Sequence, residues 1–191
     1  MPLNSKNVYI ILIVMLLNAC HNHKPKPTNN LPNNTQNWQN IKSWSFNGRM
    51  AINDGKNSGS SSIKWNVSDD SLEAQFKAPF GRSWKIFESP GQARISSSKH
   101  GDTLGHNAQI LISNELNWDF PWNKLKYWLR GYKSNSYLPI HQKTFKSIED
   151  DGWEITYPKW TQTPIGPLPK KIEARKGSYF LKLIIYNWEI N

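Results

Sequence analysis

The segment Trp44-Ser45-Phe46-Asn47-Gly48-Arg49-Met50-Ala51-Ile52 alternates apolar and polar residues, and it decides how the rest of the chain is interpreted. A period of two residues places the apolar side chains on one face of a β-strand and the polar ones on the other. The same period returns in residues 63–67, 72–78, 84–86, 93–95 and 153–157. Turn residues such as Asp69-Asp70 separate these segments. The pattern predicts a meander of short antiparallel strands with one apolar and one solvated face.

The middle of the chain changes to a helical period. Two sets of apolar residues fit the stripes of short helices, the first with Ala108, Leu111, Ile112 and Leu116 and the second with Leu125, Trp128 and Leu129. We expect Asn123 to cap the second helix and Gly131 to follow its end. The Pro- and Gly-rich residues 164–169 are expected to form a loop. In the closing run 179–188 both strand faces are apolar, with Trp188 on the face opposite Leu183.

These elements indicate a mainly β domain, with a strongly curved sheet or open barrel and short helices over one end. The candidate ligand surface is an apolar stripe of eight residues from the sheet and the helices: Trp44, Phe46, Trp65, Phe76, Trp84, Leu111, Leu125 and Trp128. Such a stripe either fills the core of a small barrel or lines a cavity for an apolar ligand. The residues alone leave both interpretations open.

The first forty residues predict export and lipidation. The apolar run 8–17 is shorter than the roughly 20 residues of a membrane-spanning helix and has the length of a signal-peptide core. It ends in Leu17-Asn18-Ala19-Cys20, which resembles the bacterial lipobox, in which the cysteine is acylated after cleavage before it. The chain is therefore expected to comprise a signal peptide (1–19), a lipidated flexible tether (20–38) and one domain (39–191). His21 stands where the inner-membrane retention signal would place Asp, so resemblance to sorted lipoproteins points to the outer membrane.

Composition and motif searches give no indication of an enzyme. The formal net charge of +10 could favour nucleic acid or an anionic membrane surface. The basic residues are spread along the predicted strands and the chain is expected to be exported, so the charge is interpreted as solvated strand faces with mild attraction to a membrane. The five histidines are scattered without metal-ligand spacing. No nucleophile motif or phosphate loop is present, so we expect no catalytic residues, no metal and no cofactor.

In order and spacing, several short motifs are similar to those of the LolB family of outer-membrane lipoproteins. They are Gly48-Arg49-Met50-Ala51-Ile52, Ala78-Pro79-Phe80-Gly81, residues 125–131 (LKYWLRG), residues 152–157 (GWEITY), and Leu168-Pro169 before the closing strand. The resemblance covers residues 44–188. It implies an unclosed antiparallel β-barrel with an α-helical lid and an apolar cavity for acyl chains. It also implies a monomer at the periplasmic face that takes lipidated cargo from a soluble, LolA-like periplasmic carrier and inserts it among outer-membrane phospholipids.

The turn at Phe80 separates two interpretations. Pro79 and Gly81 describe a tight turn, and from the residues alone Phe80 is better explained as folding back onto the core. The resemblance implies the opposite, because the family carries a protruding apolar residue, typically Leu, in this loop. Two rival functions remain open at this point: an envelope-assembly lipoprotein that binds a protein partner, and a carrier for another lipid.

Overall fold

The computed structural model describes residues 41–134 and 147–191. Every described residue belongs to one compact unit, residues 34–191. The expected signal peptide (1–19), Cys20 and the tether (20–38) lie outside the described residues.

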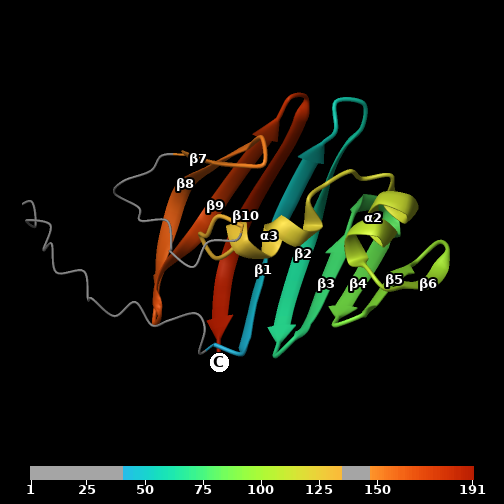
Figure 1. Ribbon diagram of the computed structural model, residues 1–191, viewed down its shortest axis with the longest axis horizontal. Coiled ribbons are helices and arrows are strands. Elements are labelled where there is room, and N and C mark those ends of the chain that lie inside the picture. Colours follow the sequence, from blue (N-terminus) through green and yellow to red (C-terminus); the bar gives the residue numbers. More distant parts are fainter. Residues whose placement is uncertain (1–40, 135–146) are drawn as a thin grey trace, which may run out of the picture. The chain divides into compact units, whose positions relative to one another are not determined.

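The described residues form one antiparallel sheet of ten strands (Figure 1). The strands are β1 (Ser43–Asn53), β2 (Ser58–Ser68), β3 (Ser71–Lys77), β4 (Ser83–Ser89), β5 (Gln92–Ser97), β6 (Gly101–Gly105), β7 (Ser147–Asp150), β8 (Trp153–Thr163), β9 (Gly166–Lys176) and β10 (Tyr179–Ile190). Their order in the sheet is β6-β5-β4-β3-β2-β1-β10-β9-β8-β7. Within the described residues β6 and β7 do not pair, so the sheet is unclosed, as predicted. The first and last strands of the chain meet at its centre.

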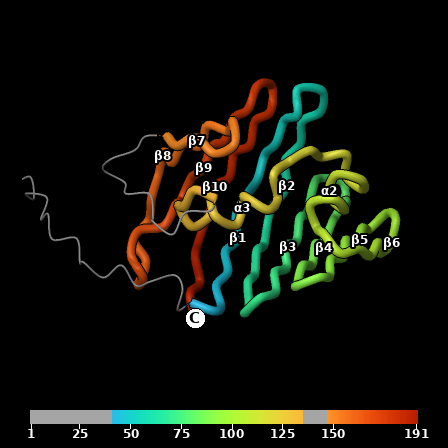
Figure 2. Tube along the Cα trace, viewed as in Figure 1, coloured from blue at the N-terminus to red at the C-terminus, as the bar shows by residue number. Residues whose placement is uncertain are grey.

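Two short helices cover one face of the sheet (Figures 1 and 2). Helix α2 (Ala108–Leu116) packs on β4, β5 and β6, and its N-cap Asn107 accepts a hydrogen bond from the backbone N–H of Ile110. Helix α3 (Trp122–Trp128) begins with Pro121 at its N-cap. The expectation of Asn123 as the cap was wrong, because a proline fits the helix start, where no intrahelical partner exists for its missing N–H.

A β-bulge between β1 and β10 changes which face Trp188 occupies. Asn47 pairs with Asn187, but Gly48 pairs with Ile185, so Tyr186 is the extra residue of the bulge. Trp188 consequently faces the core with Phe46, at a ring distance of 5.3 Å. The simple alternation put Trp188 on the face opposite Leu183 and was wrong there, because a strict two-residue period does not account for an inserted residue.

Most of the segment predicted as a Pro-rich loop, residues 166–169, belongs instead to β9, and only residues 164–165 form a turn. Pro167 and Pro169 pair with β8, whereas β10 pairs with β9 only from Lys171 onward. The two prolines therefore lie where one edge of β9 has no strand partner, and there a missing N–H is tolerated.

Candidate functional site

A partly open pocket of about 580 Å³ lies at one end of the sheet. Because the strands of a meander reverse at each turn, the turns at residues 54–57, 78–82, 98–100, 151–152 and 177–178 all lie at this end. We call it the Phe80 end. The end of α2 and the segment that follows it toward α3, within residues 115–120, line the other side of the pocket. The volume falls within the range of roughly 300–1,000 Å³ that is typical of small-molecule sites.

The apolar wall of the pocket consists mainly of aromatic rings in two groups. On one side Trp84 of β4 packs against Trp118 of the α2–α3 segment, with ring centres 6.3 Å apart. On the other side the ring of Trp153 lies 5.8 Å from Phe120 and 6.2 Å from Tyr179. These contacts join the sheet to the segment between the helices, so the pocket is bounded by rings on both of its walls.

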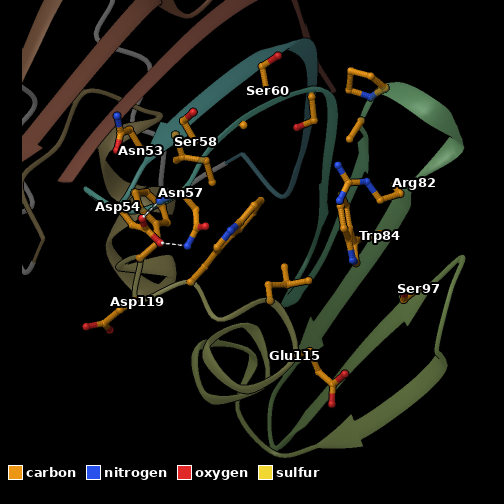
Figure 3. A pocket seen from close by; sticks show the side chains of 18 of the residues that line it. Asn53, Asp54, Asn57, Ser58, Ser60, Arg82, Trp84, Ser97, Glu115 and Asp119 are labelled. Carbon is orange, nitrogen blue, oxygen red and sulfur yellow. Dashed lines mark hydrogen bonds between the residues drawn. The ribbon is translucent and has the colours of Figure 1, made fainter. Parts of the chain in front are cut away.

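The rim of the pocket is polar, and its charges are divided (Figure 3). The sheet turns contribute Arg82 and Lys99, whereas the helical side contributes Glu115 and Asp119. The β1–β2 turn adds Asp54, whose pKa is lowered by hydrogen bonds from the backbone N–H groups of the same turn. That carboxylate is therefore satisfied within its own turn.

The structure separates the eight expected cavity residues into two groups. Trp84 lines the pocket. The other seven are buried in the hydrophobic core: Trp44, Phe46, Trp65, Phe76, Leu111, Leu125 and Trp128. Their role in holding acyl chains stays a prediction.

Helix α3 covers the part of this group around Trp65. Its Trp122 lies 4.9 Å from the ring of Trp65, and the Trp122 indole N–H donates to Glu88 of β4 at 2.9 Å. The rings of Phe46 and Trp65 stack beneath, 6.1 Å apart. Phe46 and Trp65, two sheet residues of the expected stripe, therefore lie beneath Trp122 and do not line the pocket.

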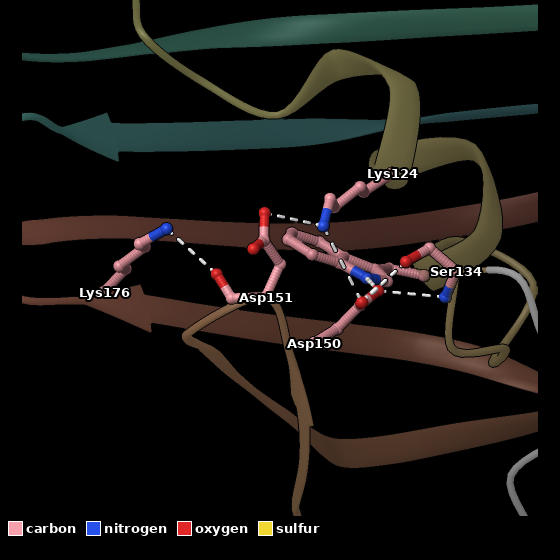
Figure 4. A network of polar contacts seen from close by, with 6 residues as sticks. Lys124, Ser134, Asp150, Asp151 and Lys176 are labelled. Carbon is pink, nitrogen blue, oxygen red and sulfur yellow. Dashed lines mark hydrogen bonds and ion pairs between the residues drawn. The ribbon is translucent and has the colours of Figure 1, made fainter.

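Asp150, at the end of β7, fastens α3 to the sheet (Figure 4). Its carboxylate accepts hydrogen bonds from the indole N–H of Trp128 (2.8 Å), the Ser134 N–H (2.9 Å) and the Ser134 hydroxyl (2.6 Å). Lys124 lies 3.8 Å from it and 2.8 Å from Asp151. Burial by itself would raise the pKa of Asp150, but the hydrogen bonds and the charge of Lys124 outweigh it and hold the pKa below the ordinary value.

A second contact holds the same end of α3. The buried hydroxyl of Tyr157 donates to the backbone oxygen of Trp128 at 3.1 Å, and burial raises its pKa. From the sequence Asp150 was given no role in the site, so this network was missed. The available signal was an acidic residue at the end of a short strand, directly before a turn.

Phe80 points into solvent with 98% of its surface exposed. It lies in a single turn of 3-10 helix, η2 (Pro79–Gly81), and has the left-handed backbone angles φ 63° and ψ 32°. That conformation is costly for a residue with a Cβ atom, by roughly 1–2 kcal/mol. The backbone thus turns the ring away from the core, and the expectation from the residues alone that Phe80 caps the core was wrong.

Within the described ranges, no group of three His, Cys, Asp or Glu side chains is placed to hold a metal ion. The helices in those ranges are too short or too polar to cross a membrane.

A family profile described as Outer membrane lipoprotein LolB matches residues 42–188. The outer-membrane lipoprotein LolB of Marinomonas sp. (strain MWYL1) is 28% identical, over 97% of this chain and 98% of that protein. The LolB of Xanthomonas campestris pv. campestris (strain B100) is also 28% identical, over 78% of this chain and 72% of its own. Among solved structures, a DUF1329 family protein from Desulfovibrio piger superposes with a TM-score of 0.51 and 7% identity, covering 82% of this chain and 89% of that one. This last likeness shows a shared fold alone.

Proposed function

The chain belongs to the LolB family of outer membrane lipoproteins, and from that premise we propose that it accepts lipid-modified proteins from a soluble periplasmic carrier and passes them to the outer membrane. Its own anchor is lipid on Cys20, and the domain faces the periplasm. The carrier is a LolA-like protein, and the final acceptor is phospholipid. Cargo moves by differences in affinity, without nucleotide or cofactor.

The observation that carries this proposal is an aromatic pocket that opens beside an exposed phenylalanine. Transfer of acyl chains from water into an apolar site gains about 0.8 kcal/mol for each buried methylene. The half-buried rings of Trp84 and Trp118 provide such a surface on one wall, and the buried rings of Phe120 and Trp153 back the other wall. A site that is partly open also allows the chains to leave again when lipid competes for them.

Acceptance is tested by transfer of a fluorescent lipoprotein from its carrier to residues 21–191, which include the whole compact unit 34–191. Trp118→Glu puts a charge into the pocket at a half-buried position outside the core, so we expect a folded variant that accepts little cargo. Ile110→Glu on α2 is the matched control, since Ile110 is 59% exposed and does not line the pocket. Normal acceptance by Trp118→Glu would show that acyl chains bind elsewhere.

Delivery is tested separately with the loaded protein and liposomes. Phe80→Glu should fold and accept cargo but fail to release it into lipid, because a charged tip does not enter the acyl boundary of a bilayer. Phe80→Leu should deliver as the parent does. Equal delivery by Phe80→Glu would remove Phe80 from the mechanism.

A further inference from the structure

The turn that carries Phe80 is hydrogen-bonded to the next turn along the sheet end. The Ser98 N–H donates to the Ser83 carbonyl at 3.0 Å, and the Ser83 N–H donates to the Ser98 hydroxyl oxygen at 3.1 Å. The same hydroxyl donates to the Gly81 carbonyl at 3.5 Å. Residues 78–82 and 98–100 therefore form one unit, which we call the paired turns.

The paired turns carry basic residues and no acidic ones. Arg82 and Lys99 are exposed, as is Lys77 at the end of β3. Among the ion pairs of the described residues none involves these three cations. The exposed imidazole of His100 lies directly after Lys99 in the chain.

The acidic groups near the pocket lie elsewhere or are already occupied. Glu115 and Asp119 come from the helical side of the rim (Figure 3). Asp151 is paired with Lys124 at 2.8 Å. At the opposite end of the sheet the β2–β3 turn is acidic, with Asp69-Asp70. Positive charge is thus placed around Phe80, the most exposed aromatic side chain among the described residues.

We propose that the paired turns are a docking surface for anionic phospholipid, in which Phe80 enters the acyl boundary while Arg82 and Lys99 bind lipid phosphates. This inference rests on the proposed function and adds to it the lipid class and the residues that recognise it. An apolar tip surrounded by cations complements an anionic bilayer surface, where burial of the tip and attraction of the cations act together. Ser98 is a positioning residue, because it fixes Lys99 relative to Phe80.

The test measures sedimentation of residues 21–191 with vesicles of phosphatidylcholine alone or with about a third of phosphatidylglycerol. The parent should bind the anionic vesicles more tightly, and added salt should weaken that binding. The double variant Arg82→Gln/Lys99→Gln should lose about thirtyfold in partitioning, which corresponds to about 1 kcal/mol for each cation. The control, Lys64→Gln/Lys159→Gln, removes two exposed cations from strands β2 and β8 and should bind almost as the parent does.

Each outcome decides one claim. Equal binding of the parent to neutral and anionic vesicles overturns the inference, and so does unchanged binding of the Arg82/Lys99 double variant. If that variant binds vesicles normally but takes up less cargo from the carrier, the paired turns dock the carrier instead. Failure of the proposed function would give a different result. The parent would then accept no cargo, yet it would still bind anionic vesicles more tightly than neutral ones, and the Arg82/Lys99 double variant would still lose that binding.

Discussion

Replacing Asp150 should show how firmly α3 is held over the core. In Asp150→Ala the Trp128 indole N–H loses its acceptor inside a site from which water is excluded, and Ser134 loses two hydrogen bonds. An unsatisfied buried donor costs about 1–3 kcal/mol, and breaking a buried charged network costs about 3–5 kcal/mol in all. We therefore expect the free energy of unfolding to fall by about 4 kcal/mol.

Asp150→Asn separates the hydrogen bonds from the charge. The amide oxygen can replace the carboxylate oxygen that accepts from Trp128, while the amide NH₂ donates to the Ser134 hydroxyl, which can turn to accept it. What is lost is the interaction with Lys124, which is 3.8 Å away and already shared with Asp151. The expected loss is therefore only about 1 kcal/mol.

The assay is urea unfolding followed by tryptophan fluorescence, with Asp151→Ala as the exposed neighbour that should change stability much less. The pKa of Asp150 is lower in the folded protein than in the unfolded chain, where it is about 3.9. The ionised carboxylate therefore contributes its full share of the folding stability above that pH, and this share is lost as the pH falls through the folded pKa. The difference in the free energy of unfolding between the parent and Asp150→Asn should therefore become smaller at acidic pH. The reasoning is refuted if Asp150→Ala unfolds at the parent's urea midpoint, or if Asp150→Asn is as unstable as Asp150→Ala.

Three further predictions address other parts of the chain. Gly48→Ala should lower the free energy of unfolding by about 3 kcal/mol, because the added Cβ would lie 2.2 Å from the Ile184 carbonyl oxygen. Gly59→Ala is the control in the same urea titration and should be nearly neutral, because the space around Gly59 is open. Phe80→Asn should melt at the parent's temperature or slightly above it, because Asn tolerates the left-handed conformation, while liposome delivery falls; a clear loss of thermal stability would show that the exposed ring supports the fold. Cys20→Ala should give an unacylated protein or an uncleaved precursor by mass spectrometry of the amino terminus, and an unacylated Cys20 on the native protein would contradict the anchor.

Much of the fold followed from local patterns in the sequence. The two-residue alternation predicted the buried face of β1, β2, β3, β5 and the first half of β8, since one face of an antiparallel sheet is buried and the other is solvated. The spacing of Ala108, Leu111 and Ile112 was sufficient to place α2, because a helical stripe is a local pattern. The errors at Trp188 and Pro167 arose from strand pairing. A bulge shifts the two-residue alternation, and an absent neighbouring strand allows proline in a strand, and both features depend on the partner strand and not on the local sequence.

The site was less predictable than the fold. Alternation places Trp65 and Trp84 on the same face, but it does not say that α3 covers the first and leaves the second beside an opening. Coverage depends on the tertiary position of the helix, which Asp150 and Tyr157 fix over long sequence distances. Likewise, the composition of the Phe80 turn was compatible with either direction of the ring, and the left-handed backbone at Phe80 itself decides between them.

The pairing of β1 with β10 also has a consequence for the order of folding. Trp44 pairs with Ile190, so the centre of the sheet joins the two extremes of the domain, while β1–β6 and β7–β10 are each built from neighbours along the chain. Contacts between distant segments form slowly, because the chain must lose the entropy of closing a long loop before these contacts contribute any favourable free energy. As the chain emerges from the export machinery, the first meander can assemble early, yet β1 keeps an unpaired edge until the last strand is available. Such an edge is a template for pairing with other chains, and the interval before β10 arrives is therefore the time at which a nascent molecule is most exposed to aggregation.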